Sequence, residues 1–248
     1  MPTPLILMIH GAYHWGGCFQ KVADQLALRG FRVATPDLAS HGYDATPYNA
    51  IADMAAYCAP AEKLLLAAEV PVVMVGHSMG GATLNYLGAK HQERIAKLVY
   101  LAAYLCAPGR AIVDDSQTPE AAAGQGHRLH DPNGPRDGLP IDAGDTDLLK
   151  SVFFADCSER DIAVAQANIC RVNSAVPALW KSELSPDAAP PRAYIECTAD
   201  NAVPLALQRR FQKDMPCAEV RTLEGASHSP FFSRPQELAN VIADLATR

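Results

Sequence analysis

The sequence feature that most constrains this chain is the stretch Val72–Gly81, which reads V-V-M-V-G-H-S-M-G-G. Residues 71–75 are apolar and rich in β-branched side chains, which is typical of a strand buried on both faces. A G-x-S-x-G motif and then a helix-compatible run follow, so the chain turns sharply at Ser78. Such a turn strains the serine backbone and needs small neighbours, which Gly76 and Gly80 supply. This context predicts a nucleophilic serine, and the alternative is a Gly-rich loop with an incidental serine.

Composition limits the kinds of protein that this chain can form. With 248 residues, 49% apolar and 19% charged, it can bury a large core. A net charge of −6 argues against binding to nucleic acid or to an anionic membrane. The amino terminus lacks the pattern of a signal peptide, and Glu69 and Pro71 interrupt the longest apolar tract, residues 64–75. Seven cysteines without a C-x-x-C motif indicate a reducing compartment, so we expect a cytoplasmic protein.

Short apolar runs alternate with stretches whose apolar residues recur at helical spacing. We expect strands at residues 5–9, 31–34, 71–75, 95–101, 193–197 and 219–223, and helices near 19–26, 51–68, 82–90, 204–213 and 238–245. Pro60 should kink or restart the second helix. The alternation predicts an α/β fold, with a mostly parallel central sheet flanked by helices, in a single domain over residues 1–248.

The alternation breaks between about residues 108 and 190. Residues 117–145 are rich in Gly, Pro, Asp and Ala, and a helix is expected to begin near Ser158. We expect this insertion to form a mobile cap over the edge of the sheet where Ser78 lies, without a core of its own.

A serine nucleophile needs a base, and the base needs an orienting acid. His228 is the only histidine after the insertion and directly follows the last predicted strand, so it is the candidate base. Asp200, in the loop after the penultimate strand, is the candidate acid, and Glu196 is the rival within that strand. The alternatives are a polar loop histidine and an aspartate that caps the next helix.

The oxyanion of the intermediate needs two N–H donors. We assign them to Met79, at the start of the helix after the serine, and to Ala12, in the loop after the first strand. His10 and His14 leave a strand rather than share a helix, so we expect them to orient this loop and not to bind zinc. No metal and no cofactor are expected.

Several segments together resemble the α/β-hydrolase superfamily, in particular its hydroxynitrile-lyase-like branch, which includes plant methylesterases such as salicylic-acid-binding protein 2. The matching segments are I-H-G-A at 9–12, V-G-H-S-M-G-G at 75–81, Y-L-A-A-Y at 100–104, Y-I-E-C-T-A-D at 194–200 with Pro204, and G-A-S-H at 225–228. The resemblance spans nearly the whole chain and is weakest in the insertion. It implies a triad of Ser78, Asp200 and His228.

The resemblance leaves more than one activity open. Plant hydroxynitrile lyases of this type carry a threonine where this chain has Gly11 and a lysine where it has Ser229, so the resemblance favours hydrolysis of small carboxylic esters. The alternatives are a hydroxynitrile lyase, a C–C or thioester hydrolase, and a receptor of this fold that binds a small ligand with little turnover. A small-molecule ester is the expected partner, with neither nucleic acid nor a membrane, and a homodimer is compatible with the sequence.

Aromatic residues are the candidates for an apolar substrate pocket, although each could equally belong to the core. Together with two residues of the first loop, the candidate substrate-binding residues are Gly11, His14, Tyr104, Phe153, Phe154 and Trp180.

Overall fold

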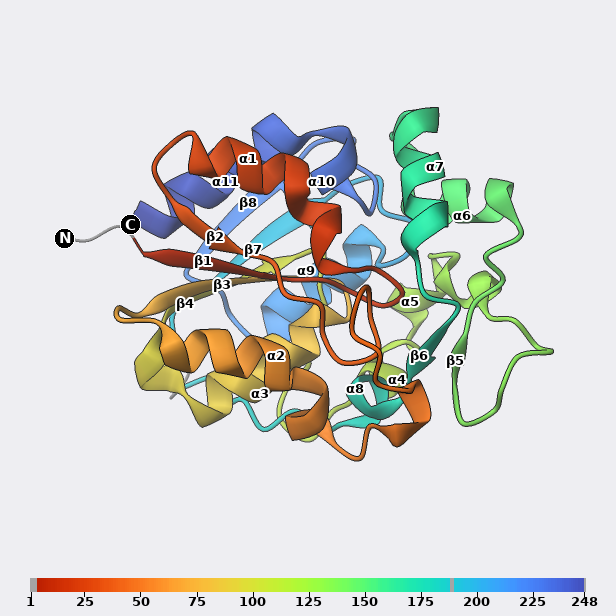
Figure 1. Cartoon of the computed structure of the whole chain (residues 1–248), viewed down its shortest axis with the longest axis horizontal. Coiled ribbons are helices and arrows are strands. Elements are labelled where there is room, and N and C mark those ends of the chain that lie inside the picture. Colours follow the sequence, from red (N-terminus) through yellow and green to blue (C-terminus); the bar gives the residue numbers. More distant parts are fainter. Residues whose placement is uncertain (1–3, 188–189, 248) are drawn as a thin grey trace.

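A central sheet of six strands organises the computed structural model, which describes residues 4–187 and 190–247 (Figure 1). The strand order is β2-β1-β3-β4-β7-β8, and every neighbouring pair is parallel. The strands are β1 (Leu5–Ile9), β2 (Arg32–Ala34), β3 (Val72–His77), β4 (Ile95–Leu101), β7 (Arg192–Cys197) and β8 (Glu219–Leu223). The predicted α/β fold with a parallel sheet is therefore confirmed.

Helices cover both faces of this sheet (Figure 1). One face carries α1 (Gln20–Ala27), α10 (Pro230–Ser233) and α11 (Pro235–Thr247), and the other carries α2 (Met54–Ala67), α3 (Gly80–Lys90) and α9 (Leu205–Asp214). Short 3-10 helices lie at η1 (Gly16–Phe19), η2 (Tyr48–Ala50) and η3 (Gln92–Arg94). Among the described residues, no helix has both the length and the apolar character that crossing a bilayer requires.

Successive residues of each strand enter two different cores. Ile6 and Met8 of β1 pack under α1 and α11, whereas Leu7 and Ile9 pack under α2 and α3, and all four are fully buried. Side chains of a strand alternate between the faces of a sheet, so a strand covered on both faces must be apolar throughout. This requirement explains the continuous apolar runs in the sequence.

Helix α2 continues through Pro60 without the restart that was one of the two predicted outcomes, and the other, a kink, stays a prediction. Proline in a helix interior removes one backbone hydrogen bond and costs about 3 kcal/mol. The helix offsets this cost with a buried face that includes Tyr57 and Leu65, and the Asp53 side chain accepts a hydrogen bond from the Ala56 N–H at its start. Tertiary packing therefore outweighs the local effect of the proline.

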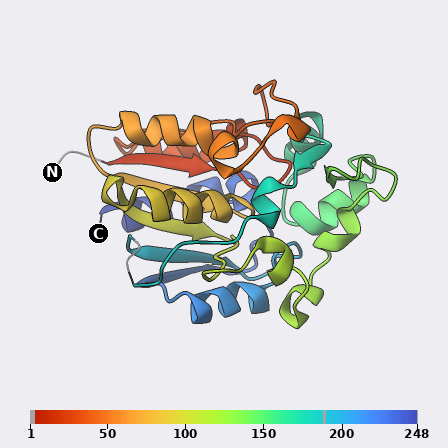
Figure 2. The same cartoon turned by 90° about the horizontal axis from the view of Figure 1, so that it is seen from below.

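The insertion between β4 and β7 lies beyond the carboxyl ends of the strands (Figures 1 and 2). Some of its buried apolar side chains, among them Leu149, Val152 and Phe154, join the core under α1 and α11, and others, such as Ile112 and Leu184, join the core on the opposite face. The expected helix starts after Ser158, whose hydroxyl accepts a hydrogen bond from the Asp161 N–H. The elements of the insertion are α4 (Ile112–Asp115), α5 (Pro119–Ala122), η4 (Gly126–Leu129), β5 (Gly138–Pro140), α6 (Thr146–Phe153), α7 (Glu159–Asn168), β6 (Val172–Ser174) and α8 (Val176–Leu179).

The antiparallel pairing of β5 with β6 is a feature that the sequence analysis did not predict. Each strand has only three residues, too few for an alternating pattern to stand out. This small sheet matters for function because β6 reaches the loop after β1, as described below.

Candidate active site

Ser78 occupies a strained turn between β3 and α3. Its φ is +53°, in the left-handed region that non-glycine residues rarely adopt. A Cβ at Gly76 would lie 2.6 Å from the Leu84 side chain, and one at Gly80 would lie 2.7 Å from the His10 carbonyl oxygen. Backbone atoms face the Gly80 position, so only glycine fits there, whereas a side chain at Gly76 would require the Leu84 methyl groups to shift.

Asp200 and His228 form a buried pair at the carboxyl ends of β7 and β8. His228 Nδ1–H donates to Asp200 Oδ2 at 2.7 Å, and the two residues are 1% and 5% exposed. The other carboxylate oxygen, Oδ1, accepts the N–H groups of Ala202 and Val203 at 2.7 and 2.9 Å. Because three donors converge on one carboxylate, its orientation toward the imidazole is fixed.

His228 is also held by contacts with His77, which directly precedes Ser78, and with Phe153 of the insertion. His77 Nε2–H donates to the His228 carbonyl oxygen at 2.9 Å, and their ring centroids are 4.4 Å apart. The Phe153 ring stacks on His228 with a centroid distance of 5.4 Å, and Phe153 lines the same cavity as Ser78. The structure therefore brings the three predicted triad residues to one region at the carboxyl edge of the sheet.

The rival carboxylate Glu196 has other partners. Arg209, Gln212 and Thr222 donate to its oxygens at 2.9 to 3.4 Å. Burial raises the pKa of Glu196, but these hydrogen bonds outweigh burial and hold the pKa below its ordinary value. No hydrogen bond joins Glu196 to His228 among the residues that the structure describes.

The predicted oxyanion donors border the cavity beside Ser78. Ala12 and Met79 both line it, and in the described part of the chain their N–H groups donate no hydrogen bond. A Cβ at Gly11 would lie 2.7 Å from the Ser78 Cβ, so a side chain there would displace the serine. Gly11 therefore acts here as a spacer that lets the loop approach Ser78, and it does not line the cavity.

Buried histidines hold this region together. His10 accepts the Leu38 N–H on Nε2 at 3.1 Å, and His14 Nδ1–H donates to the Ala12 carbonyl oxygen at 2.8 Å. Burial lowers the pKa of His14 to about 4 and that of His10 well below its ordinary value, so both are neutral at pH 7. Within residues 4–187 and 190–247, no cluster of His, Cys, Asp or Glu could hold a metal ion.

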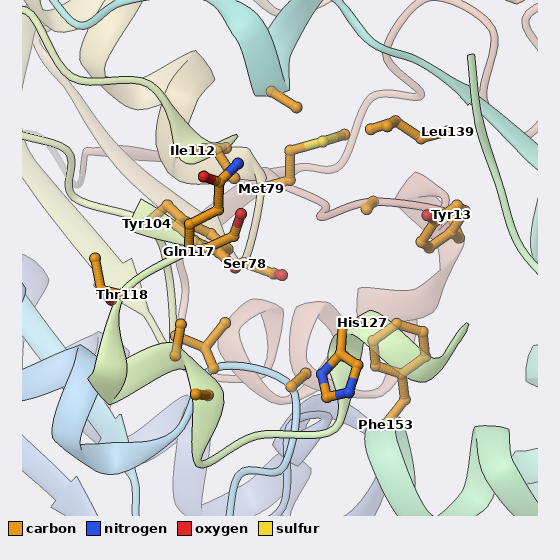
Figure 3. Close-up of a pocket in the computed structure, with 18 residues that line it drawn as sticks. Tyr13, Ser78, Met79, Tyr104, Ile112, Gln117, Thr118, His127, Leu139 and Phe153 are labelled. Carbon is orange, nitrogen blue, oxygen red and sulfur yellow. The ribbon is translucent and has the colours of Figure 1, made fainter. Parts of the chain in front are cut away.

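A cavity of about 540 Å³ opens in front of Ser78, between the sheet edge and the insertion (Figure 3). Of the residues predicted to bind substrate, Tyr104 and Phe153 line it. The rest of the described lining was not predicted from the sequence and comprises Tyr13, Ile112, Ser116, Gln117, Thr118, Ala121, Ala122, Gly126, His127, Leu139, Ala178, Ala202 and Val203. Most of these belong to short elements of the insertion, where the sequence gives no periodic signal.

Three other predicted substrate-binding residues do not line this cavity. Phe154 is fully buried and packs against Phe232, with ring centroids 6.0 Å apart. His14 is buried among aromatic rings, and Trp180 packs edge-on against Tyr86 at 5.7 Å. Phe154 and His14 are buried in the core and Trp180 packs partly buried against it, so none of the three lines this cavity, and their contact with substrate stays a prediction.

The family of this chain is identified by its similarity to known proteins. The profile of the alpha/beta hydrolase family matches residues 6–241. The chain belongs to this family. A pyrethroid hydrolase from Sphingobium wenxiniae is 34% identical over 244 residues, which cover 97% of this chain and 87% of the relative. The putative chloroplastic methylesterase 11 of Arabidopsis thaliana is 32% identical, and the match covers 99% of this chain and 65% of the relative.

A solved structure agrees with these relatives. The crystal structure of a pyrethroid hydrolase from Sphingobium faniae superposes with a TM-score of 0.88 at 33% identity, covering 98% of this chain and 97% of that one. The predicted relationship to plant methylesterases within the α/β hydrolases is therefore confirmed. The named relatives are carboxylic ester hydrolases.

Proposed function

We propose that this protein hydrolyses small, uncharged carboxylic esters, with Ser78 as nucleophile, His228 as base and Asp200 as orienting acid. The observation that carries the proposal is the buried 2.7 Å hydrogen bond between His228 and Asp200, near a serine with positive φ that lines a cavity. The esterase and hydrolase names of the relatives support the same reaction class.

In the proposed mechanism, His228 Nε2 takes the proton of the Ser78 hydroxyl as the oxygen attacks the ester carbonyl. The Ala12 and Met79 N–H groups stabilise the resulting oxyanion, and Asp200 stabilises the imidazolium. His228 returns the proton to the departing alcohol, which leaves an acyl group on Ser78. Water, deprotonated by His228, then attacks this acyl group and releases the carboxylic acid.

The lining of the cavity indicates which esters would fit. No Lys, Arg, Asp or Glu is among its described lining residues, and the apolar groups include Phe153, Leu139 and Ile112 (Figure 3). A charged acyl or alcohol group would lose hydration there without gaining a counter-ion. The volume of about 540 Å³ suits a small-molecule ligand of drug size, and a relative named pyrethroid hydrolase is consistent with an uncharged ester.

We further propose that residues 108–190 act as a cap, because their side chains form much of the cavity wall. A cytoplasmic location and a homodimer stay predictions. The seven cysteine thiols, all free and all within the described residues, are compatible with a reducing compartment.

The proposal is tested with a panel of p-nitrophenyl alkyl esters and aromatic methyl esters. Wild type and the control Ser185→Ala, an exposed serine outside the cavity, should release product over many turnovers. Ser78→Ala should release none while it stays folded, and turnover by this variant would contradict the mechanism. Stoichiometric binding of an ester without turnover would favour a receptor, and cleavage of a cyanohydrin alone would favour a lyase.

A further inference from the structure

One side chain of the insertion contacts both segments that carry the proposed oxyanion donors. Asn173, on β6, is fully buried. Its Oδ1 accepts the Tyr13 N–H at 3.0 Å, and its Nδ2 donates to the Met79 sulfur at 3.8 Å. Tyr13 directly follows Ala12, and Met79 is itself the second proposed donor, so a single amide links the two halves of the oxyanion hole.

The peptide unit between Ala12 and Tyr13 is held at both ends. Its carbonyl oxygen accepts the His14 Nδ1–H at 2.8 Å, and its N–H donates to Asn173 Oδ1. The preceding N–H of Ala12 donates no hydrogen bond within the described residues, and Ala12 lines the cavity beside Ser78. The orientation of that N–H depends on the peptide unit that Asn173 holds, because the two units share the Ala12 Cα.

The conformation being held is a strained one. Tyr13 has φ +63°, and non-glycine residues in this region cost of order 1 kcal/mol unless their surroundings fix them. Cys170 strengthens the restraint, because its N–H donates to the Tyr13 carbonyl oxygen at 2.9 Å and its thiol donates to Asn173 Oδ1 at 3.0 Å. Both backbone groups of Tyr13 are therefore bound by the insertion.

We propose that Asn173 is a positioning residue for the oxyanion hole, through which the insertion sets the catalytic rate. This inference rests on the proposed serine mechanism. An asparagine suits the role because its amide supplies an acceptor for the loop and a donor for Met79 within one rigid group. Its removal would leave a buried N–H without a partner and let the strained loop relax.

The test compares Asn173→Ala with Ser174→Ala, its neighbour on β6. Ser174 is buried and accepts the Val176 N–H on Oγ at 3.3 Å, so its loss perturbs the insertion without touching Tyr13 or Met79. We expect Asn173→Ala to lower kcat by about 10- to 100-fold with KM changed by less than about threefold. Ser174→Ala should retain the wild-type kcat.

A second readout separates positioning from loss of structure. A trifluoromethyl ketone forms an anionic adduct with the serine, whereas the matching methyl ketone binds without one. In Asn173→Ala the affinity for the trifluoromethyl ketone should fall in parallel with kcat, and the affinity for the methyl ketone should stay within about threefold. Equal losses for both ketones would show a merely structural role and overturn the inference.

The remaining outcomes are also decisive. If Asn173→Ala does not fold, Asn173→Asp replaces it, because this variant keeps an oxygen for the Tyr13 N–H. Its carboxylate can no longer donate to the Met79 sulfur and would oppose a nearby oxyanion, so kcat should fall at least about tenfold at unchanged KM. Wild-type kcat in either folded variant contradicts the inference and leaves the proposed function intact. Absence of ester turnover in wild type itself overturns both.

Discussion

Replacing Asp200 by asparagine keeps the shape of the side chain and removes one acceptor oxygen. In the structure, Oδ1 accepts two backbone N–H groups and Oδ2 accepts His228 Nδ1–H. The single oxygen of asparagine should face the two backbone donors, because the opposite orientation points an NH₂ group at both of them. The NH₂ group then faces His228 Nδ1, which must become an acceptor, and the imidazole proton moves to Nε2.

That tautomer cannot accept a proton from Ser78, so the variant should lose catalysis while it keeps its fold. The corresponding change in a serine protease triad lowers kcat by about 10⁴-fold, which equals about 5 kcal/mol of transition-state stabilisation. Because the amide still satisfies the backbone donors of Ala202 and Val203, the free energy of unfolding should fall by only about 1–3 kcal/mol.

The assay is steady-state hydrolysis of the best ester of the panel near pH 7, with urea unfolding measured on the same preparations. Glu196→Gln is the matched control, because Glu196 is the rival carboxylate and binds Arg209 instead of the histidine. It should keep kcat within about threefold of wild type. An Asp200→Asn variant with more than a tenth of the wild-type kcat would refute the argument, and a large loss in Glu196→Gln alone would assign the acid to that residue.

Acid should destabilise the fold, because burial lowers the pKa of His14 and His41 to about 4 from an ordinary 6.5. The unfolded chain binds protons below about pH 6.5 that the folded chain does not bind until about pH 4. Near pH 5 each histidine should therefore lower the free energy of unfolding by about 2 kcal/mol, so the urea midpoint should be lower at pH 5 than at pH 7. An equal midpoint at the two pH values would contradict this prediction. Phe153→Ala should raise KM severalfold for bulky esters, because Phe153 lines the cavity. Phe154→Ala should lower the free energy of unfolding by about 3–5 kcal/mol with unchanged substrate preference, because Phe154 is buried in the core. The reverse pattern would show that the cavity wall is wrongly assigned. Gly81→Ala should lower the free energy of unfolding by at least about 2 kcal/mol in thermal or urea unfolding, because its Cβ would lie 2.0 Å from the Tyr104 carbonyl oxygen. Wild-type stability of this variant would show that the loop containing Tyr104 can move aside.

The sequence predicts the sheet well because buried parallel strands leave a strong signal. The observed bounds of β1, β4 and β8 equal the predicted runs at residues 5–9, 95–101 and 219–223. The contact between Asp200 and His228 was also predictable, since loops after parallel strands meet at one edge of the sheet. Local pattern and chain order suffice for both inferences.

The cavity wall and the hydrogen bonds behind it depend on tertiary contacts that no local pattern records. Phe153 and Phe154 are adjacent and of the same residue type, yet only Phe153 lines the cavity. Asn173 lies 160 residues from Tyr13 in the sequence, on a strand of three residues. Helix α2 shows the same limit, because packing of its buried face decides the outcome at Pro60.

Labelling with a fluorophosphonate, followed by mapping of the labelled residue by mass spectrometry, shows whether Ser78 is a nucleophile activated by His228. We expect one phosphonyl group per chain, on Ser78, with no label in Ser78→Ala and labelling slowed at least about 10³-fold in His228→Ala. Ser116 also lines the cavity. Label on Ser116, or undiminished labelling of Ser78 in His228→Ala, would show that Ser78 is not a nucleophile activated by His228.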